Sequence, residues 1–141
     1  MLAWLLVAAL SIGLAMLLAA ADGALLASAH DAPRDTTVDP ERSHRALALG
    51  RVLAHLVTGM AVALALSQAF IMPVALIVGL VLLVANVALV EGMARGAGHA
   101  RAPALLQRFS PVFTITDGLM WPVTWAGAAV ERALARLLPP A

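Results

Sequence analysis

The fold is decided by residues 52–90, which read VLAHLVTGMAVALALSQAFIMPVALIVGLVLLVANVALV. This stretch has no Asp, Glu, Lys or Arg. As a single helix it would be roughly 58 Å long, nearly twice the hydrocarbon core of a bilayer. It must therefore fold back, and Pro73 marks the place because proline cannot continue a helix and restricts the residue before it. The pattern predicts two spanning helices, at about 51–70 and 73–91, in a tight hairpin.

A further apolar stretch precedes this hairpin. Residues 1–21 carry no charged side chain and the apolar character continues past Asp22, so we predict a spanning helix over about 2–28. The tripeptide Ala27-Ser28-Ala29 also has the form of a signal-peptide cleavage site, which leaves removal of this segment as an alternative. The first four residues hold no arginine or lysine and the apolar stretch is long, which favours a retained helix.

The composition indicates an integral membrane protein whose surroundings are the lipid bilayer. Hydrophobic residues make up 62% of the chain and charged residues 12%, whereas a soluble domain has about 25% charged residues. The absence of cysteine excludes disulfides and thiolate chemistry. No Ser-His-acid set or phosphate loop is present, so we expect no enzyme. No basic cluster is interleaved with aromatic residues, so we expect no nucleic-acid partner.

The basic residues predict the topology. All nine are arginines, and they fall into two regions that flank residues 52–90. Because arginine-rich loops stay in the cytoplasm, we predict a multi-pass protein of the inner (plasma) membrane, with the N-terminus outside and the C-terminus inside. The arginines are Arg34, Arg42, Arg45, Arg51, Arg95, Arg101, Arg108, Arg132 and Arg136.

Two polar regions are expected on the cytoplasmic side. Residues 30–50 predict a solvated loop containing a short interfacial helix, with Asp39 as its N-cap and Pro40 at the first helical position. Residues 103–138 predict amphipathic helices along the membrane surface, in which Gly118 and Pro122 interrupt the apolar pattern. A fourth span over 109–130 is the alternative. The predicted fold is thus a single all-α membrane domain over residues 1–141, with three transmembrane helices and cytoplasmic-side juxtamembrane helices.

Two carboxylates are the candidate functional residues. Asp22 interrupts the first apolar stretch, and Glu91 ends the third. A carboxylate facing lipid is costly, so each needs water, an arginine or a cation, and we expect the two to meet on the inner half of the bundle. Two interpretations of these acids remain open. They could share a bound cation, or an acid could pair with an arginine, as Glu91 could with Arg95. His55 could join this cluster, and Asn86 could hydrogen-bond a neighbouring helix.

Small residues form a candidate packing surface. Gly59, Ala63 and Ser67 recur every four residues on the second predicted span, so another helix can approach closely there. The surface predicts either packing within the bundle or assembly into a homodimer or larger membrane complex.

Four short segments carry a family resemblance: AAADGA (19–24), RVLAHLVTGM (51–60), VEGMAR (90–95) and WPVTW (121–125). With the three spans, they resemble the membrane domain of the CNNM/CorC family of magnesium and cobalt transport proteins. That family has motifs similar to SGxETA, an arginine followed by an apolar run and Gly-Asn, and GExxPK. Gly59 and Glu91 match these motifs, and Asp22 stands at the acidic position of the first. Ala19 replaces the serine, Met60 the asparagine, and Val90 and Ala94 the glycine and proline of the last motif.

The resemblance implies a relation to divalent cation transport. Mg²⁺ prefers oxygen ligands in octahedral geometry, and of the family's side-chain ligands this chain keeps only acids, at Asp22 and Glu91. We therefore expect a degenerate Mg²⁺ site in a protein related to cation transport. The alternative is a non-transporting structural or accessory membrane subunit that docks to a larger complex. The resemblance also implies a homodimer, and we expect the CBS pair that usually follows this domain to be missing.

Overall fold

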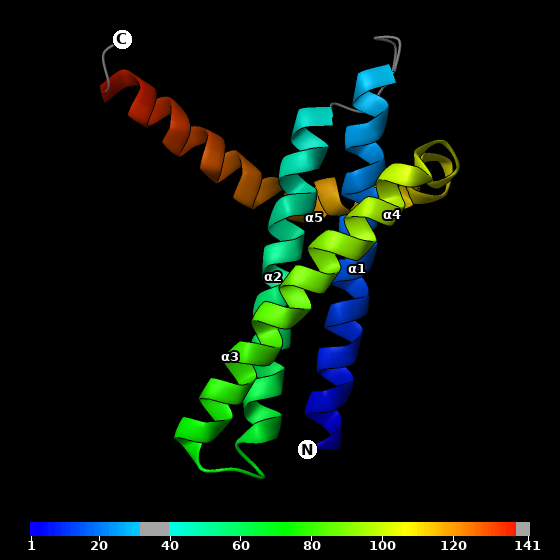
Figure 1. The fold of residues 1–141 in the computed structure, drawn as a ribbon. Coiled ribbons are helices and arrows are strands. Elements are labelled where there is room, and N and C mark those ends of the chain that lie inside the picture. Colours follow the sequence, from blue (N-terminus) through cyan, green and yellow to red (C-terminus); the bar gives the residue numbers. More distant parts are fainter. Residues whose placement is uncertain (32–39, 138–141) are drawn as a thin grey trace.

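The structure is a computed structural model that describes residues 1–31 and 40–137 (Figure 1). Throughout these residues the regular elements are helical. They are α1 (Leu2–Asp31), α2 (Pro40–Leu66), α3 (Met72–Leu89), the π-helical turn η1 (Val90–Ala94), α4 (Arg95–Ala100) and α5 (Ala102–Leu137). Within the described part, three helices are long and apolar enough to cross a membrane, at Leu2–Ser28, Glu41–Leu66 and Met72–Ala100. The predicted all-helical fold with three such helices is confirmed.

The second helix begins earlier than the sequence predicts. It starts at Pro40, the predicted first residue of a short interfacial helix, and runs unbroken to Leu66. Residues 40–50 are therefore part of this long helix and not of a separate loop. The reason is that one face of this polar segment continues the apolar periodicity: Ser43, Ala46 and Leu47 are all buried. Asp39, the predicted N-cap, lies outside the described residues.

The bundle is centred on α1 and α2, which lie side by side in opposite directions (Figure 1). Small residues line their contact, which lets the backbones approach closely. One cluster of buried residues consists of Ala15, Ala19, Ala54, Val90 and Ala94. Near the N-terminal end of α1, the hydroxyl oxygens of Ser11 and Thr58 lie 2.7 Å apart and hydrogen-bond the two helices.

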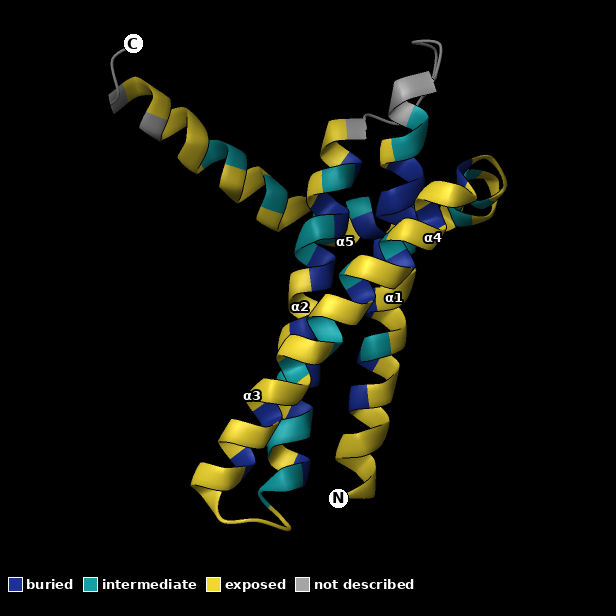
Figure 2. Cartoon of the chain, viewed as in Figure 1, coloured by how far each residue is buried: buried dark blue, intermediate teal, exposed yellow. Residues whose placement is uncertain are grey.

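Residues 67–71 connect α2 to α3. Ile71 has an extended backbone at the start of α3, with Pro73 in its first turn. Proline is tolerated there because the first N–H groups of a helix have no partner within the helix. From there α3 packs back on α2: a Cβ at Gly79 would be 3.8 Å from the Cα of Ala63, an ordinary contact. Most of α3 is otherwise exposed, as is the N-terminal half of α1 (Figure 2).

The third spanning helix changes its packing partner at η1. Before this turn α3 packs against α2, and after it α4 packs against α1. A π turn holds one residue more than an α-helical turn, which rotates the residues of α4 by about 100° around the helix axis. A methyl group at Gly98 would overlap the carbonyl oxygen of Ala20, and one at Gly23 would overlap that of Arg95. The α1–α4 contact therefore depends on both glycines.

The last element is one long helix. α5 continues through Pro111, Gly118 and Pro122, although the sequence predicts an interruption at the last two. Its first part packs Phe113 against Leu18 of α1 and other buried residues, and its C-terminal part extends away from the bundle (Figure 1). α5 is not among the three described helices that are apolar enough to span a membrane.

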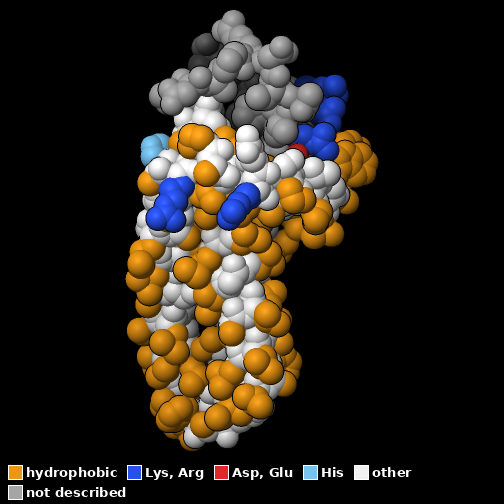
Figure 3. All heavy atoms as spheres, turned by 90° about the vertical axis from the view of Figure 1, so that its right-hand side faces the viewer, with side chains coloured by type: hydrophobic (Ala, Val, Ile, Leu, Met, Phe, Trp, Pro, Cys, Tyr) orange, Lys and Arg blue, Asp and Glu red, His pale blue; other side chains and the backbone are white. Residues whose placement is uncertain are grey.

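Charge and apolar surface are separated along the molecule. On the face shown in Figure 3, arginine side chains lie near one end, and the side chains of the long remaining part are mainly hydrophobic. The N-terminus and the α2–α3 connection lie at the apolar end (Figure 1). This separation is typical of a multi-pass membrane protein.

Candidate functional site

Asp22 is the buried centre of a cluster of charged side chains. It lies on α1 and its side chain is fully buried. Its Oδ1 hydrogen-bonds Nδ1 of His44, a residue of α2, at 2.5 Å. Its Oδ2 lies 3.2 Å from Nη2 of Arg51 and 3.2 Å from Nη2 of Arg95. The carboxylate of α1 is thus held by side chains from α2 and α4.

Glu91 lies in η1 and contacts the same two arginines. Its Oε2 accepts a hydrogen bond of 2.7 Å from Nη1 of Arg51 and lies 3.8 Å from Nη1 of Arg95. Its Oε1 is 4.0 Å from Nε2 of His55. The single guanidinium group of Arg51 therefore contacts both carboxylates, through its two terminal nitrogens. We call Asp22, Glu91, Arg51 and Arg95 the ion-pair network.

The ion-pair network extends one further step towards the apolar end. Nδ1 of His55 lies 3.2 Å from Nδ2 of Asn86, which is on α3 before the π turn. Asn86 therefore connects α3 to α2, the helix-bonding role expected for an amide in a membrane. His55 contacts both this amide and Glu91, so it links the two parts of the cluster.

Helical spacing explains how α2 supplies its part of the site. His44, Arg51 and His55 are seven and four residues apart, so they lie on one face of α2, towards α1 and η1. The π turn positions two further residues, because Glu91 lies within it and Arg95 directly follows it. The one-residue offset allows Arg95 to reach α1 while α3 keeps its contact with α2.

The ion-pair network is balanced in formal charge, with two carboxylates and two guanidinium groups. Asp22 is completely buried, the Arg51 side chain is 9% exposed, and those of Glu91 and Arg95 are about one-third exposed. Such pairs offset a large desolvation cost, and removing one partner leaves an unpaired charge. The fit is incomplete: in the described structure Oδ2 of Asp22 and Nε of Arg51 are buried without an aligned hydrogen bond. The negative charge on Oδ2 of Asp22 is therefore stabilised only by the nearby guanidinium groups of Arg51 and Arg95.

The donor set does not fit a magnesium site. All four carboxylate oxygens face nitrogen atoms of arginine or histidine, whereas Mg²⁺ requires several oxygen ligands in octahedral array. Among the side chains that the structure describes, no group of three or more His, Cys, Asp or Glu could hold a metal ion. What the site can do is hold three helices together through charge.

The predicted packing residues lie on the α3 side of α2. A Cβ on Gly59 would be 2.9 Å from Cδ2 of Leu83, and Ala63 lies opposite Gly79. Ser67 follows the last residue of α2, and its hydroxyl donates to the carbonyl oxygen of Leu64 at 2.9 Å. Gly59 and Ala63 therefore pack α2 against α3 within one chain.

Two polar contacts are not anticipated by the sequence reasoning. The sequence pattern places His44 in a solvated region, yet it hydrogen-bonds Asp22. Ser43, which is fully buried, donates to Oδ2 of Asp117 on α5 at 2.8 Å. One feature of the sequence could have predicted the His44 contact. His44 lies seven residues, or two helical turns, before Arg51, so the two share a face if the helix already begins near Pro40.

Comparisons of the chain with protein-family models, with curated proteins and with solved structures give no match.

Proposed function

We propose that this protein is a non-transporting membrane subunit, built on a plan that resembles the CNNM/CorC membrane domain. The observation that carries the proposal is the position of Arg51, whose guanidinium group contacts both Asp22 and Glu91. In the proposed function, the arginines permanently neutralise the two acids that a divalent cation site would need. The site then fixes the arrangement of α1, α2 and α4.

The exposed apolar helix surface supports a docking role. Leu80 and Val84 of α3 are more than half exposed, and α3 packs mainly on α2. In the proposed function, helices of a partner protein pack against part of this surface and lipid contacts the remainder. A second copy of the chain is the simplest partner. Gly59 and Ala63 are already in contact with α3, so a homodimer would use the opposite surface of α3.

The competing proposal is a degenerate divalent cation site at Asp22 and Glu91. Thermal unfolding of the purified protein in mild detergent, with and without Mg²⁺, separates the two. A site exposed to about 100 times its Kd of ligand would be stabilised by about 2.7 kcal/mol. We expect Mg²⁺ to leave the melting temperature unchanged and to show no flux into proteoliposomes that contain a Mg²⁺-sensitive dye. Stabilisation by Mg²⁺ that disappears in Glu91→Gln would support the cation site and contradict our proposal.

The docking role needs its own experiment. A photo-crosslinking residue at Leu80 or Val84 should give a discrete protein adduct in native membranes. A crosslinker at Leu47, which is buried in the bundle, is the control and should give no intermolecular adduct. If the α3 positions react only with lipid, the docking role is excluded for this surface.

A further inference from the structure

A groove separate from the ion-pair network lies between the N-terminal part of α2 and the middle of α5. Its volume is about 300 Å³. The α2 wall carries Glu41, Arg42 and Arg45, and the α5 wall carries Trp121 and Trp125. Charged groups of both signs thus face two indole rings.

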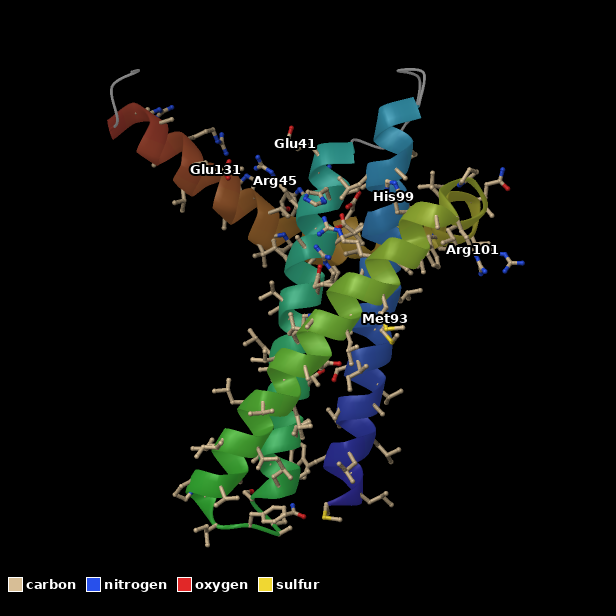
Figure 4. The ribbon with its side chains drawn as sticks, viewed as in Figure 1. Glu41, Arg45, Met93, His99, Arg101 and Glu131 are labelled. Atoms are coloured by element: carbon tan, nitrogen blue, oxygen red, sulfur yellow. The ribbon has the colours of Figure 1, made fainter. Side chains whose placement is uncertain are left out.

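One of the two ion pairs of Arg45 joins the two walls of the groove. Arg45 donates from Nη2 to Glu41 at 2.8 Å and from Nη1 to Glu131 of α5 at 3.1 Å. Figure 4 shows Arg45 and Glu131 between α2 and α5. The side chains of Arg45, Glu41 and Glu131 are 47%, 76% and 65% exposed, so a ligand can reach both signs of charge.

The two tryptophans indicate that the groove faces the headgroup level of a membrane. Trp121 and Trp125 are 53% and 59% exposed, on an amphipathic helix at the charged end of the molecule. Indole rings in such positions are typical of the headgroup level of a bilayer, where one side is wet and the other apolar. An indole face also attracts an ammonium group within about 6 Å of the ring centroid.

We infer that this groove binds the headgroup of a zwitterionic phospholipid with a primary ammonium, as in phosphatidylethanolamine. The phosphate lies against the guanidinium groups of Arg42 and Arg45, as charge-assisted hydrogen bonding favours. The ammonium donates to Glu41 and lies near an indole ring. The acyl chains continue over the exposed faces of Trp121 and Trp125.

Charge complementarity selects this headgroup over the other common classes. Glu41 and Glu131 offset the positive charge of Arg42 and Arg45, so a purely anionic headgroup meets no net positive charge at the groove. A choline headgroup carries no N–H and cannot donate to Glu41. A headgroup with both a phosphate and a hydrogen-bonding ammonium adds a partner of opposite sign for the acids and for the bases, whose paired side chains remain exposed.

Tryptophan quenching by lipids with brominated acyl chains tests the inference. The protein carries Trp4→Phe, which leaves Trp121 and Trp125 as the only indoles, and is reconstituted in phosphatidylcholine bilayers. Brominated phosphatidylethanolamine should quench more strongly than brominated phosphatidylcholine at the same mole fraction. The expected binding preference is about two- to fivefold, because the charges are exposed to solvent.

Three variants make the test specific to the groove. Glu41→Gln should remove most of the preference, and Ala128→Leu should remove it by filling the groove while keeping every charge. Arg101→Gln, whose side chain points away from the bundle on the far side (Figure 4), should keep it. Circular dichroism checks that each variant is folded. Because Ala128→Leu leaves the Arg45 ion pairs intact, it tests the groove even if Glu41→Gln loosens α5.

Two results would overturn the inference. Equal quenching by the ethanolamine and choline lipids would mean that the groove has no headgroup site. Stronger quenching by brominated phosphatidylglycerol than by phosphatidylethanolamine would mean that the arginines act as a simple anion-binding surface. Neither result depends on whether Mg²⁺ binds at Asp22 and Glu91, so the outcome is independent of the proposed function.

Discussion

Arg51 is the residue on which the charged centre of the molecule depends. It is nearly buried, and its guanidinium contacts carboxylates from α1 and η1. Coulomb attraction is strong at such a site because little water screens it, and for the same reason an unpaired charge there is expensive. The main effect of losing Arg51 is therefore the cost of two carboxylates left without it, and not the loss of the attraction itself.

Replacement of Arg51 by methionine should strongly destabilise the protein. The change leaves Asp22 and Glu91 with Arg95 alone, and breaking one partner of a buried pair costs about 3–5 kcal/mol. The loss is measured by thermal or denaturant unfolding in detergent. Arg101→Met, which removes an exposed arginine, should change stability little.

A second variant distinguishes charge imbalance from lost packing. Adding Glu91→Gln to Arg51→Met restores the charge balance, so the double variant should be less destabilised than the sum of the two single variants. Strict additivity would mean that Arg51 acts through its packing and not through the ion-pair network.

At the scale of elements, the π turn and the two glycine contacts place the third spanning helix. Gly23 and Gly98 each lie directly against a backbone carbonyl of the other helix. Side chains larger than hydrogen cannot fit there without moving α4 away from α1. Such a movement also withdraws Arg95 from Asp22, so backbone contact and ion pairing support each other.

Replacement of Gly98 by alanine should destabilise the protein by about 1–3 kcal/mol, the usual cost of overpacking. The matched control is Gly96→Ala on the same short helix, because nothing lies within 4 Å of a Cβ at Gly96. The control should be neutral or stabilising, since alanine is the better helix former. Equal effects of the two substitutions, measured by thermal unfolding, would contradict the close α1–α4 contact.

Replacement of Ala63 by leucine should weaken the packing of α2 against α3 by about 1–3 kcal/mol. Ala63 lies opposite Gly79, so the larger side chain separates helices of the same chain. Melting temperature should fall, while the oligomeric state measured by light scattering in detergent stays unchanged. Met60→Leu, at an exposed position of α2, serves as the control. A change from dimer to monomer in Ala63→Leu would show that this surface is instead an interface between copies.

Part of this arrangement is predictable from the sequence. The uncharged run of residues 52–90 is too long for one span, and Pro73 locates the break between α2 and α3. A helix start at Pro40 is predicted, but its unbroken continuation into the spanning part of α2 is not, because the charged residues Glu41, Arg42 and Arg45 conceal an apolar face that only helical spacing reveals. For the same reason His44 is missing from the predicted site.

The sequence predicts which residues form the site better than it predicts how their side chains are oriented. The cost of a carboxylate in lipid indicates that Asp22 and Glu91 each need a partner. It does not indicate that Arg51 contacts both, since this requires the relative rotation of α2 and η1. The π turn has no recognised sequence signal, and without it the direction of Arg95 cannot be derived.

At the scale of the whole molecule, arginine side chains lie near one end on the face shown in Figure 3, and the N-terminus and the α2–α3 connection lie at the other end (Figure 1). The positive-inside rule then predicts that the arginine-bearing end is cytoplasmic and that the N-terminus is outside.

Single-cysteine labelling tests this orientation, because the chain has no native cysteine. Ile71→Cys and His99→Cys both introduce a thiol at an exposed position. A membrane-impermeant maleimide applied outside intact cells should label Ile71→Cys only, and His99→Cys should react after the membrane is opened. Labelling of His99→Cys alone in intact cells would mean that the orientation is inverted.

The ion-pair network also affects how the helices should insert into the membrane during synthesis. α1 leaves the ribosome first, with a carboxylate whose partners are still absent, and insertion of an isolated Asp into lipid costs about 2.5–3.5 kcal/mol at mid-membrane. His44 and Arg51 arrive with α2, and Arg95 arrives only after α3 has been made. α1 and α2 should therefore leave the translocon as a pair, since each neutralises a charge that the other carries. The polar contacts that hold the finished protein together thus also determine when its first helix can enter the bilayer.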